Sequence, residues 1–329
     1  MTRHTRLHIF MAAACGAFIL AACEAPDTAG DAAARDNAAL EAPAQPAATG
    51  DTQAEATPQG APALWTLSDE DTVVHLFGTV HILRPETEWR TPAFDAVFEA
   101  ADAIYFEADV SSPESAQAMA RLVPQLGVYT DGTRLSQVLD EAERRTVEEA
   151  MDHIGVPMAA IEPMKPWLAT VQLSVQALVK QGYSPESGVE TVLTEAAETA
   201  GKELRFLETG EQQLRFFADM SQDDQVEFLV ASAEQIVDNP QLLDTLVDKW
   251  ARGDVDAIGQ IMADPDVMGS QHVYDVLIVE RNANWTAQIE ALMADEAGTF
   301  LIAVGAGHLA GEDSVAEMLR ARGYAVEGP

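Results

Sequence analysis

Short apolar runs lie near the two ends of the chain and once in its middle, and longer stretches between them alternate with a helical period. The first two runs are separated by the acidic, polar segment 68–71, which predicts a hairpin turn. The predicted strands are residues 64–67, 72–77, 103–106, 204–207, 300–304 and, at an edge, 324–326.

The helical period covers residues 112–201 and 221–296, and a shorter helix is predicted to begin near Pro92. Residues 168–178 and 225–237 are clear amphipathic examples. Strands toward both ends with helices between them predict an α/β fold. We expect a central mixed sheet built from the N- and C-terminal parts, with a large helical insertion.

The first 22 residues have the pattern of an export signal. Arg3 and Arg6 precede an apolar run over residues 9–22, which is too short for a comfortable membrane span. The run ends in Leu20-Ala21-Ala22-Cys23, which resembles the lipobox of bacterial lipoproteins. That resemblance implies cleavage before Cys23 and acylation of this residue, which would hold the protein at a membrane. An ordinary signal peptide with a chance cysteine is the alternative.

Residues 24–63 are rich in Ala, Pro, Gly, Thr and acidic residues, and Leu40 is the only large apolar residue among them. Such a segment cannot bury enough surface to offset its ordering entropy, so a disordered tether is predicted. The predicted organisation is a signal peptide (1–22), a lipidated Cys23 with its tether (23–63), and one folded domain (64–329). Because Glu24, and not Asp, follows the cysteine, the lipobox resemblance favours the outer membrane, facing the periplasm.

Charge and cysteine content exclude several classes of function. The 329 residues carry 54 Asp and Glu against 19 Lys and Arg, a formal net charge of −35, which repels nucleic acid. Both cysteines, Cys15 and Cys23, lie in the signal or at the lipid site, so the folded domain has no disulfide and no thiol chemistry.

Candidate chemistry lies where predicted strands end. Gly78-Thr79-Val80-His81 follows the second strand, and Gly305-Ala306-Gly307-His308 follows the strand over 300–304. Glu107 comes directly after the strand over 103–106. Open α/β sheets bind ligands at the carboxyl ends of their strands. Two imidazoles and one carboxylate from separate strands could hold a divalent metal there, with Glu107, His81 and His308 as ligands.

Other interpretations of these residues remain open. Either histidine could be a hydrogen-bonded structural residue, and residues 305–311 could form a phosphate-binding loop, although their glycine spacing departs from the dinucleotide pattern. His75 is expected to pack within a strand, and His153 and His272 to lie on helices. The sequence lacks the common zinc-protease, serine-hydrolase and P-loop motifs.

Several motifs in a fixed order resemble the TraB/GumN family, and the resemblance runs from about residue 64 to 326. The segments that carry it are Leu64-Trp65, 76–83, Phe106-Glu107-Ala108-Asp109, Leu207-Glu208-Thr209 with Gln212-Gln213, Glu280-Arg281-Asn282, 305–311 and 319–324. This family is related to the Tiki proteins. The relationship implies a membrane-tethered metalloprotease with paired G-x-x-H motifs and an essential glutamate.

The resemblance implies a role for each matching residue. His81 and His308 would be metal ligands or catalytic histidines, and Glu107 a metal ligand or the general base. Arg281 would bind an anion or stabilise a developing oxyanion. Glu208 is a second carboxylate candidate for catalysis. The plainer alternatives are a helix-surface ion pair for Arg281 and an exposed helix-start residue for Glu208.

The expected function is an envelope-anchored, metal-dependent hydrolase of the peptidase type. A mixed histidine and carboxylate site suits Mn²⁺, Co²⁺ or Zn²⁺, and the Tiki resemblance implies the first two. Metal-activated water would attack the carbonyl of a peptide or protein substrate. We expect no organic cofactor, no nucleic-acid partner, and membrane contact through the lipid alone. The alternatives are a non-catalytic lipoprotein that binds or sequesters peptides, and a structural envelope protein.

Overall fold

The computed structural model describes residues 60–109 and 112–329. The predicted signal peptide, Cys23 and the tether up to residue 59 lie outside the described residues. Within the described part of the chain, no helix combines the length and apolar character needed to cross a bilayer.

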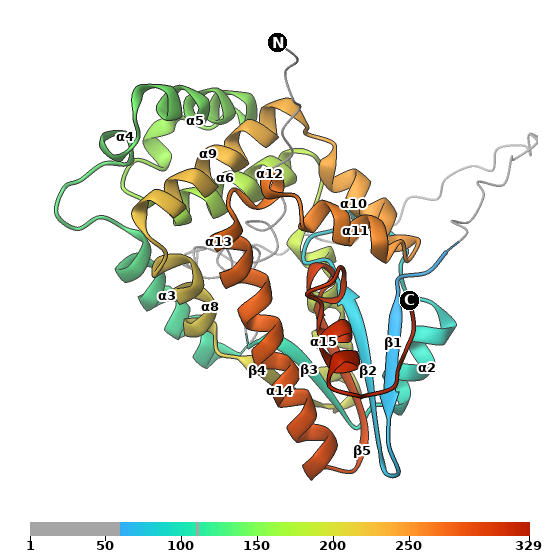
Figure 1. Ribbon diagram of the computed structural model, residues 1–329. Coiled ribbons are helices and arrows are strands. Elements are labelled where there is room, and N and C mark those ends of the chain that lie inside the picture. Colours follow the sequence, from blue (N-terminus) through green and yellow to red (C-terminus); the bar gives the residue numbers. More distant parts are fainter. Residues whose placement is uncertain (1–59, 110–111) are drawn as a thin grey trace, which may run out of the picture.

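A six-stranded mixed sheet forms the centre of the fold (Figure 1). Its order is β4-β3-β5-β2-β1-β6. The four strands β4, β3, β5 and β2 run parallel, whereas β1 pairs antiparallel with β2 and with β6. The strand bounds are β1 Leu64–Ser68, β2 Thr72–Thr79, β3 Ala103–Ala108, β4 Glu203–Glu208, β5 Gly298–Gly305 and β6 Val326–Glu327.

The predicted α/β fold with a mixed sheet is confirmed, and the differences lie at strand ends. Strand β3 continues through Glu107 to Ala108, so Glu107 lies inside the strand and not beyond it. Strand β2 likewise includes Gly78 and Thr79. The predicted edge strand over 324–326 is instead the short β6, Val326–Glu327.

The helical insertion is divided in two by β4. One part lies between β3 and β4, and the other between β4 and β5. Outside it, α2 (Pro92–Ala100) joins β2 to β3, and α15 (Val315–Ala321) follows β5. The first part contains α3 Pro113–Gly127, α4 Leu135–Val138, α5 Glu141–Ile154, α6 Pro166–Lys180 and α7 Val189–Ala200. The second contains α8 Gly210–Ala218, α9 Gln222–Asp238, α10 Leu242–Ala251, α11 Val255–Met262, α12 Pro265–Met268, α13 Gln271–Tyr274 and α14 Glu280–Asp295.

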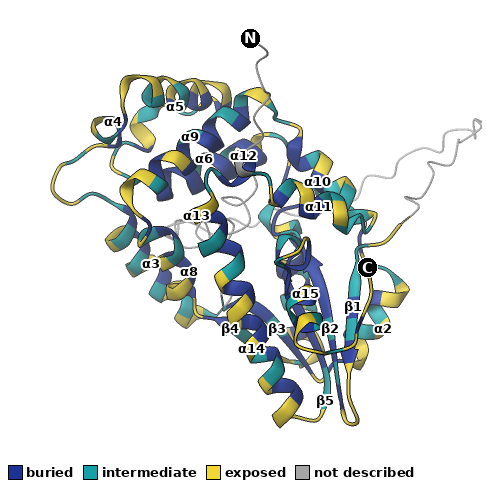
Figure 2. Ribbon diagram, viewed as in Figure 1, coloured by how far each residue is buried: buried dark blue, intermediate teal, exposed yellow. Residues whose placement is uncertain are grey.

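Successive residues of a strand point to opposite faces of the sheet, and each face packs into a separate hydrophobic core. Ile302 and Val304 of β5 pack with Trp285 of α14 and with α15. Leu301 and Ala303, which point the other way, join the core that includes α2, α7 and much of the insertion. A third core lies among α5, α6 and α9, away from the sheet. Figure 2 shows the strands buried between their helical layers.

Helix α11 packs directly on the loop that follows β5. A Cβ atom at Gly259 would stand 2.7 Å from the backbone nitrogen of Gly311 and 2.8 Å from its Cα. The two backbones therefore meet without an intervening side chain, and this close packing fixes α11 beside the segment that carries His308.

This contact predicts that Gly259→Ala changes the stability of the fold in the direction opposite to the usual one for a helix. Replacing glycine by alanine inside a helix ordinarily stabilises it by about 1 kcal/mol. Here we expect destabilisation of roughly 1–3 kcal/mol, because the added methyl group displaces backbone. Thermal unfolding measures the change, with the exposed neighbour Gln260→Ala as control. A melting temperature at or above that of the parent would show that the contact is looser than described.

Candidate active site

The carboxyl ends of the four parallel strands meet at one edge of the sheet. In the strand register, Thr79 of β2 lies beside Gly305 of β5, and Phe106 of β3 lies beside Ala303. On the other side of β3, Ala108 lies beside Glu208 at the end of β4. The residues that follow or end these strands therefore share one site, at the place where open α/β sheets bind ligands.

His81, Glu107 and His308 converge at this edge. The Nε2 atom of His308 lies 3.8 Å from Oε1 of Glu107, and Nε2 of His81 lies 4.0 Å from the same oxygen. All three residues are at most 6% exposed. The predicted convergence is thus present, whereas the chemical roles of the three residues stay predictions.

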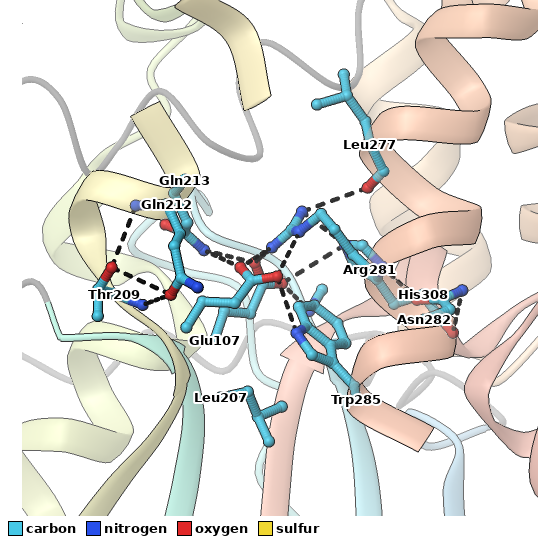
Figure 3. Close-up of polar contacts among 12 residues, drawn as sticks. Glu107, Leu207, Thr209, Gln212, Gln213, Leu277, Arg281, Asn282, Trp285 and His308 are labelled. Atoms are coloured by element: carbon cyan, nitrogen blue, oxygen red, sulfur yellow. Dashed lines mark hydrogen bonds and ion pairs between the residues drawn. The ribbon is translucent and has the colours of Figure 1, made fainter. Parts of the chain in front are cut away.

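Arg281 forms the polar centre of the site (Figure 3). Its Nη2 donates to Oε2 of Glu107 at 2.6 Å and to Oε2 of Glu208 at 2.9 Å, and its Nε donates to Oε1 of Glu208 at 3.0 Å. Trp285 and Gln213 donate to these carboxylates as well. Arg281 is 2% exposed. The two carboxylates thus surround a buried cation, and the simple surface ion pair considered from the sequence is not what forms.

The same guanidinium determines the tautomer of His308. Its Nη1 lies 3.2 Å from Nε2 of His308, and a guanidinium can only donate. Nε2 therefore accepts, and the ring proton resides on Nδ1, which donates to Oδ1 of Asn282 at 2.7 Å. The amide of Asn282 is oriented in turn by donating to the backbone carbonyl of Asp313. The Nε2 lone pair of His308 is thus directed at Arg281, which lines the same site.

His81 is oriented from behind by a carboxylate. Its Nδ1 lies 2.7 Å from Oε1 of Glu190, at the start of α7, and the hydroxyl of Thr79 donates to the same oxygen. This leaves Nε2 facing Glu107. Both histidines therefore turn Nε2 toward one carboxylate oxygen, and each has its Nδ1 held by a second residue.

Burial and neighbouring charges together determine the pKa values of the site residues, and the net direction differs from one residue to the next. Burial alone would raise the pKa of Glu107, but Arg281 and the Gly305 N–H hold it well below its usual range. Burial, together with Arg281, lowers the pKa of His308 to about 3. Burial would lower the pKa of His81 too, but the carboxylates of Glu190 and Glu107 together outweigh it and raise the pKa. For Glu208, burial exceeds the effect of Arg281, and its pKa is raised.

No group of three or more His, Cys, Asp or Glu side chains among residues 60–109 and 112–329 is arranged as a metal site. The donor chemistry at the strand edge nevertheless fits a divalent ion, because two imidazole nitrogens and one carboxylate oxygen face each other. A tetrahedral ion with bonds of about 2 Å separates its ligand atoms by roughly 3.3 Å. The distances from the Glu107 oxygen to His308 and His81, 3.8 and 4.0 Å, exceed this value by about 0.5 and 0.7 Å.

Not every predicted residue reaches the cavity at this edge. His81, Glu107, Arg281 and His308 line it, whereas Glu208 lies behind Arg281 and is not part of the lining. Glu208 is also buried, which excludes the exposed helix-start alternative.

Histidines outside the site have ordinary surroundings. His75 pairs with the hydroxyl of Thr66 within the β1–β2 hairpin, and His153 and His272 are exposed on helices. Residues 306–309 form a single 3₁₀ turn. The Gly305 N–H, which a phosphate loop would need, already donates to Glu107.

Three residues that orient side chains of the site were not predicted from the sequence. Glu190, Gln213 and Asn282 all come from the helical insertion, far in sequence from the strands they serve. Gln213 and Asn282 stand within the family motifs quoted above, and this was the available signal. Glu190 lies in an ordinary amphipathic helix, and nothing in its sequence distinguishes it from a solvated glutamate.

Comparison with known proteins identifies the family of the chain. The sequence profile of the TraB/PrgY/gumN family matches residues 63–328. The chain belongs to this family. It is 24% identical over 246 residues to the uncharacterized protein YbaP of Escherichia coli (strain K12), covering 75% of this chain and 87% of that protein. YbaP of Shigella flexneri matches equally. No solved structure matches the chain.

The buried ion cluster predicts a large loss of stability for Arg281→Met. Removing the cation leaves Glu107 and Glu208 buried without their counter-charge, which costs about 3–5 kcal/mol. Arg205→Met is the matched control, because Arg205 also contacts two carboxylates, Glu203 and Glu296, but near the surface, where such pairs contribute about 0–1 kcal/mol. Urea unfolding compares the two. Equal losses would contradict the central role of Arg281.

Proposed function

We propose that this protein is a metal-dependent hydrolase that cleaves peptide bonds, held in the bacterial envelope by lipid on Cys23. The observation that carries the proposal is the convergence of His81, His308 and Glu107 beside a buried guanidinium, in a cavity at the carboxyl edge of the sheet. Family membership is compatible with this proposal, because all four residues lie within the segments that resemble the family.

His81, His308 and Glu107 are the residues that would hold the metal. The low pKa of Glu107 keeps it ionised, and the Nδ1 proton of His308 leaves Nε2 unprotonated, as ligation requires. Coordination through Nε2 would replace the hydrogen bond that it accepts from Arg281. Glu190 and Asn282 orient the two rings, as carboxylates and amides commonly do around metal-binding histidines. A bound Mn²⁺, Co²⁺ or Zn²⁺ supplies the acidity that activates water near neutral pH.

Arg281 and Glu208 act as a pair. Arg281 lines the cavity, and its positive charge can stabilise the negative charge that develops on a carbonyl oxygen during hydrolysis. Glu208 does not line the cavity, but its two bonds to the guanidinium fix the plane in which Arg281 donates. We therefore assign Glu208 the role of a positioning residue, in place of the catalytic carboxylate suggested by the sequence.

A non-catalytic peptide-binding lipoprotein is the second candidate. One observation favours it: both oxygens of Glu107 already accept hydrogen bonds, from Gly305 and from Arg281 with Gln213. Such a protein would bind peptides equally well with and without metal, and would leave them intact.

Metal binding predicts a rise in melting temperature on addition of Mn²⁺, Co²⁺ or Zn²⁺ to the full chain. An ion at 100 times its dissociation constant stabilises the folded state by about 2.7 kcal/mol. We expect His81→Ala and His308→Ala to abolish the rise, and His75→Ala, a histidine in the same hairpin region but outside the site, to retain it. An equal rise in all four proteins would place the bound ion elsewhere.

Hydrolysis is tested with a peptide library and mass spectrometry in the presence of each metal. Glu107→Gln should lower kcat by roughly 10²–10⁴-fold. Glu208→Gln should lower kcat by roughly 10-fold with KM little changed, because only the orientation of Arg281 is affected. Glu203→Gln, on the same strand but exposed, is the control. Undiminished cleavage by the Glu107→Gln variant would contradict the role of Glu107 in hydrolysis.

A further inference from the structure

The cavity at the sheet edge has two chemically different parts. The cavity opens to solvent and has a volume of about 80 Å³. One part, which we call the polar base, consists of His81, Glu107, Arg281 and His308. The other, which we call the apolar wall, consists of Leu243, Leu246, Val247, Ile258, Met262 and Ile278.

Helix α10 presents its apolar stripe to this cavity. Leu243, Leu246, Val247 and Trp250 recur at the spacing of one helix face, and all four line the cavity. The indole nitrogen of Trp250 donates to the carbonyl of Gly78, so its polar atom is already satisfied. Helix α11 adds Ile258 and Met262, which are one turn apart. Figure 1 shows both helices above the end of the sheet.

The charged side chains of α10 have partners away from the apolar wall. Asp244 accepts from Arg84 and from the hydroxyl of Tyr183. Lys249 pairs with Asp254, and Asp248 pairs with Arg252. None of these charged residues lines the cavity, so a charged group entering it would meet no charged side chain outside the polar base.

We propose that the apolar wall is a specificity pocket for one large apolar side chain, such as Leu, Met or Phe, of a peptide whose neighbouring carbonyl lies at the polar base. The inference rests on the proposed function for the position of that carbonyl. The pocket itself follows from the separation of apolar and charged lining. Burial against Leu246 and Met262 favours a large apolar side chain, and the absence of charged partners on the wall rejects Asp and Lys.

The test measures binding separately from cleavage. The probes are fluorescently labelled, end-blocked heptapeptides that differ only at the central residue: Leu, Phe, Ala, Asp or Lys. Fluorescence anisotropy with the full chain in EDTA, which suppresses metal-dependent cleavage, gives the dissociation constants. We expect the Leu and Phe peptides to bind about 10- to 100-fold more tightly than Ala, and Asp and Lys more weakly still.

Two variants change the shape of the pocket. Val247→Trp fills it and should remove the preference for Leu and Phe, whereas Met262→Ala enlarges it and should shift the preference toward Phe. Val179→Trp is the matched control, because Val179 is exposed on α6 and does not line the cavity. Circular dichroism establishes that each variant is folded, and the second variant serves if the first does not fold.

Each outcome decides one proposal. A preference for apolar peptides that Val247→Trp or Met262→Ala alters and Val179→Trp keeps supports the pocket. If these peptides then remain intact with every metal, the hydrolase proposal fails and the pocket stands. Cleavage without preference at the central residue, tightest binding of Asp or Lys peptides, or no binding by any probe would overturn the pocket.

Discussion

Burial of the Arg281 charge is the constraint on which the site depends. A guanidinium enclosed by protein is tolerated only when acceptors surround it, because its desolvation otherwise costs several kcal/mol. Glu107 from β3 and Glu208 from β4 supply them, and Trp285 of α14 donates to Glu208 while its ring lies 4.7 Å from the guanidinium carbon. Two strands and a helix distant in sequence must therefore meet in one register for the fold to form.

The chemistry of the two histidines follows from that cluster. Arg281 sets the proton of His308 on Nδ1, and both Nε2 atoms lie near a single oxygen of Glu107. Asn282, adjacent to Arg281 on the same helix, completes the arrangement by accepting a hydrogen bond from Nδ1 of His308. Consecutive residues of α14 thus control a carboxylate and an imidazole from different strands, so a small displacement of this helix would disturb both.

The sequence predicts the site residues that lie at the ends of strands, but not the residues that orient their side chains. His81 and His308 follow parallel strands, and Glu107 lies near the end of another, so their convergence follows from the topology. Glu190 and Asn282 belong to helices whose docking depends on tertiary packing, and of the two only Asn282 lies within a segment that resembles the family. The apolar run also misplaces the end of β3. The run stops at Phe106, but β3 continues to Ala108 because β4 still pairs with it there.

The insertion and the sheet contribute different properties to one cavity. In the polar base, Glu107 lies within strand β3 and is bonded to Arg281 and Gly305, and Nδ1 of each histidine is held by Glu190 or Asn282. The apolar wall depends on α10 and α11, and α11 is attached to the His308 loop through the Gly259–Gly311 backbone contact. Side chains such as Val247 can change volume without disturbing that attachment or the charges below. The size and shape of the apolar wall can therefore change through α10 and α11 while the contacts within the polar base are retained, whereas Ile278 of the wall and Arg281 of the base lie three residues apart and are tied to each other.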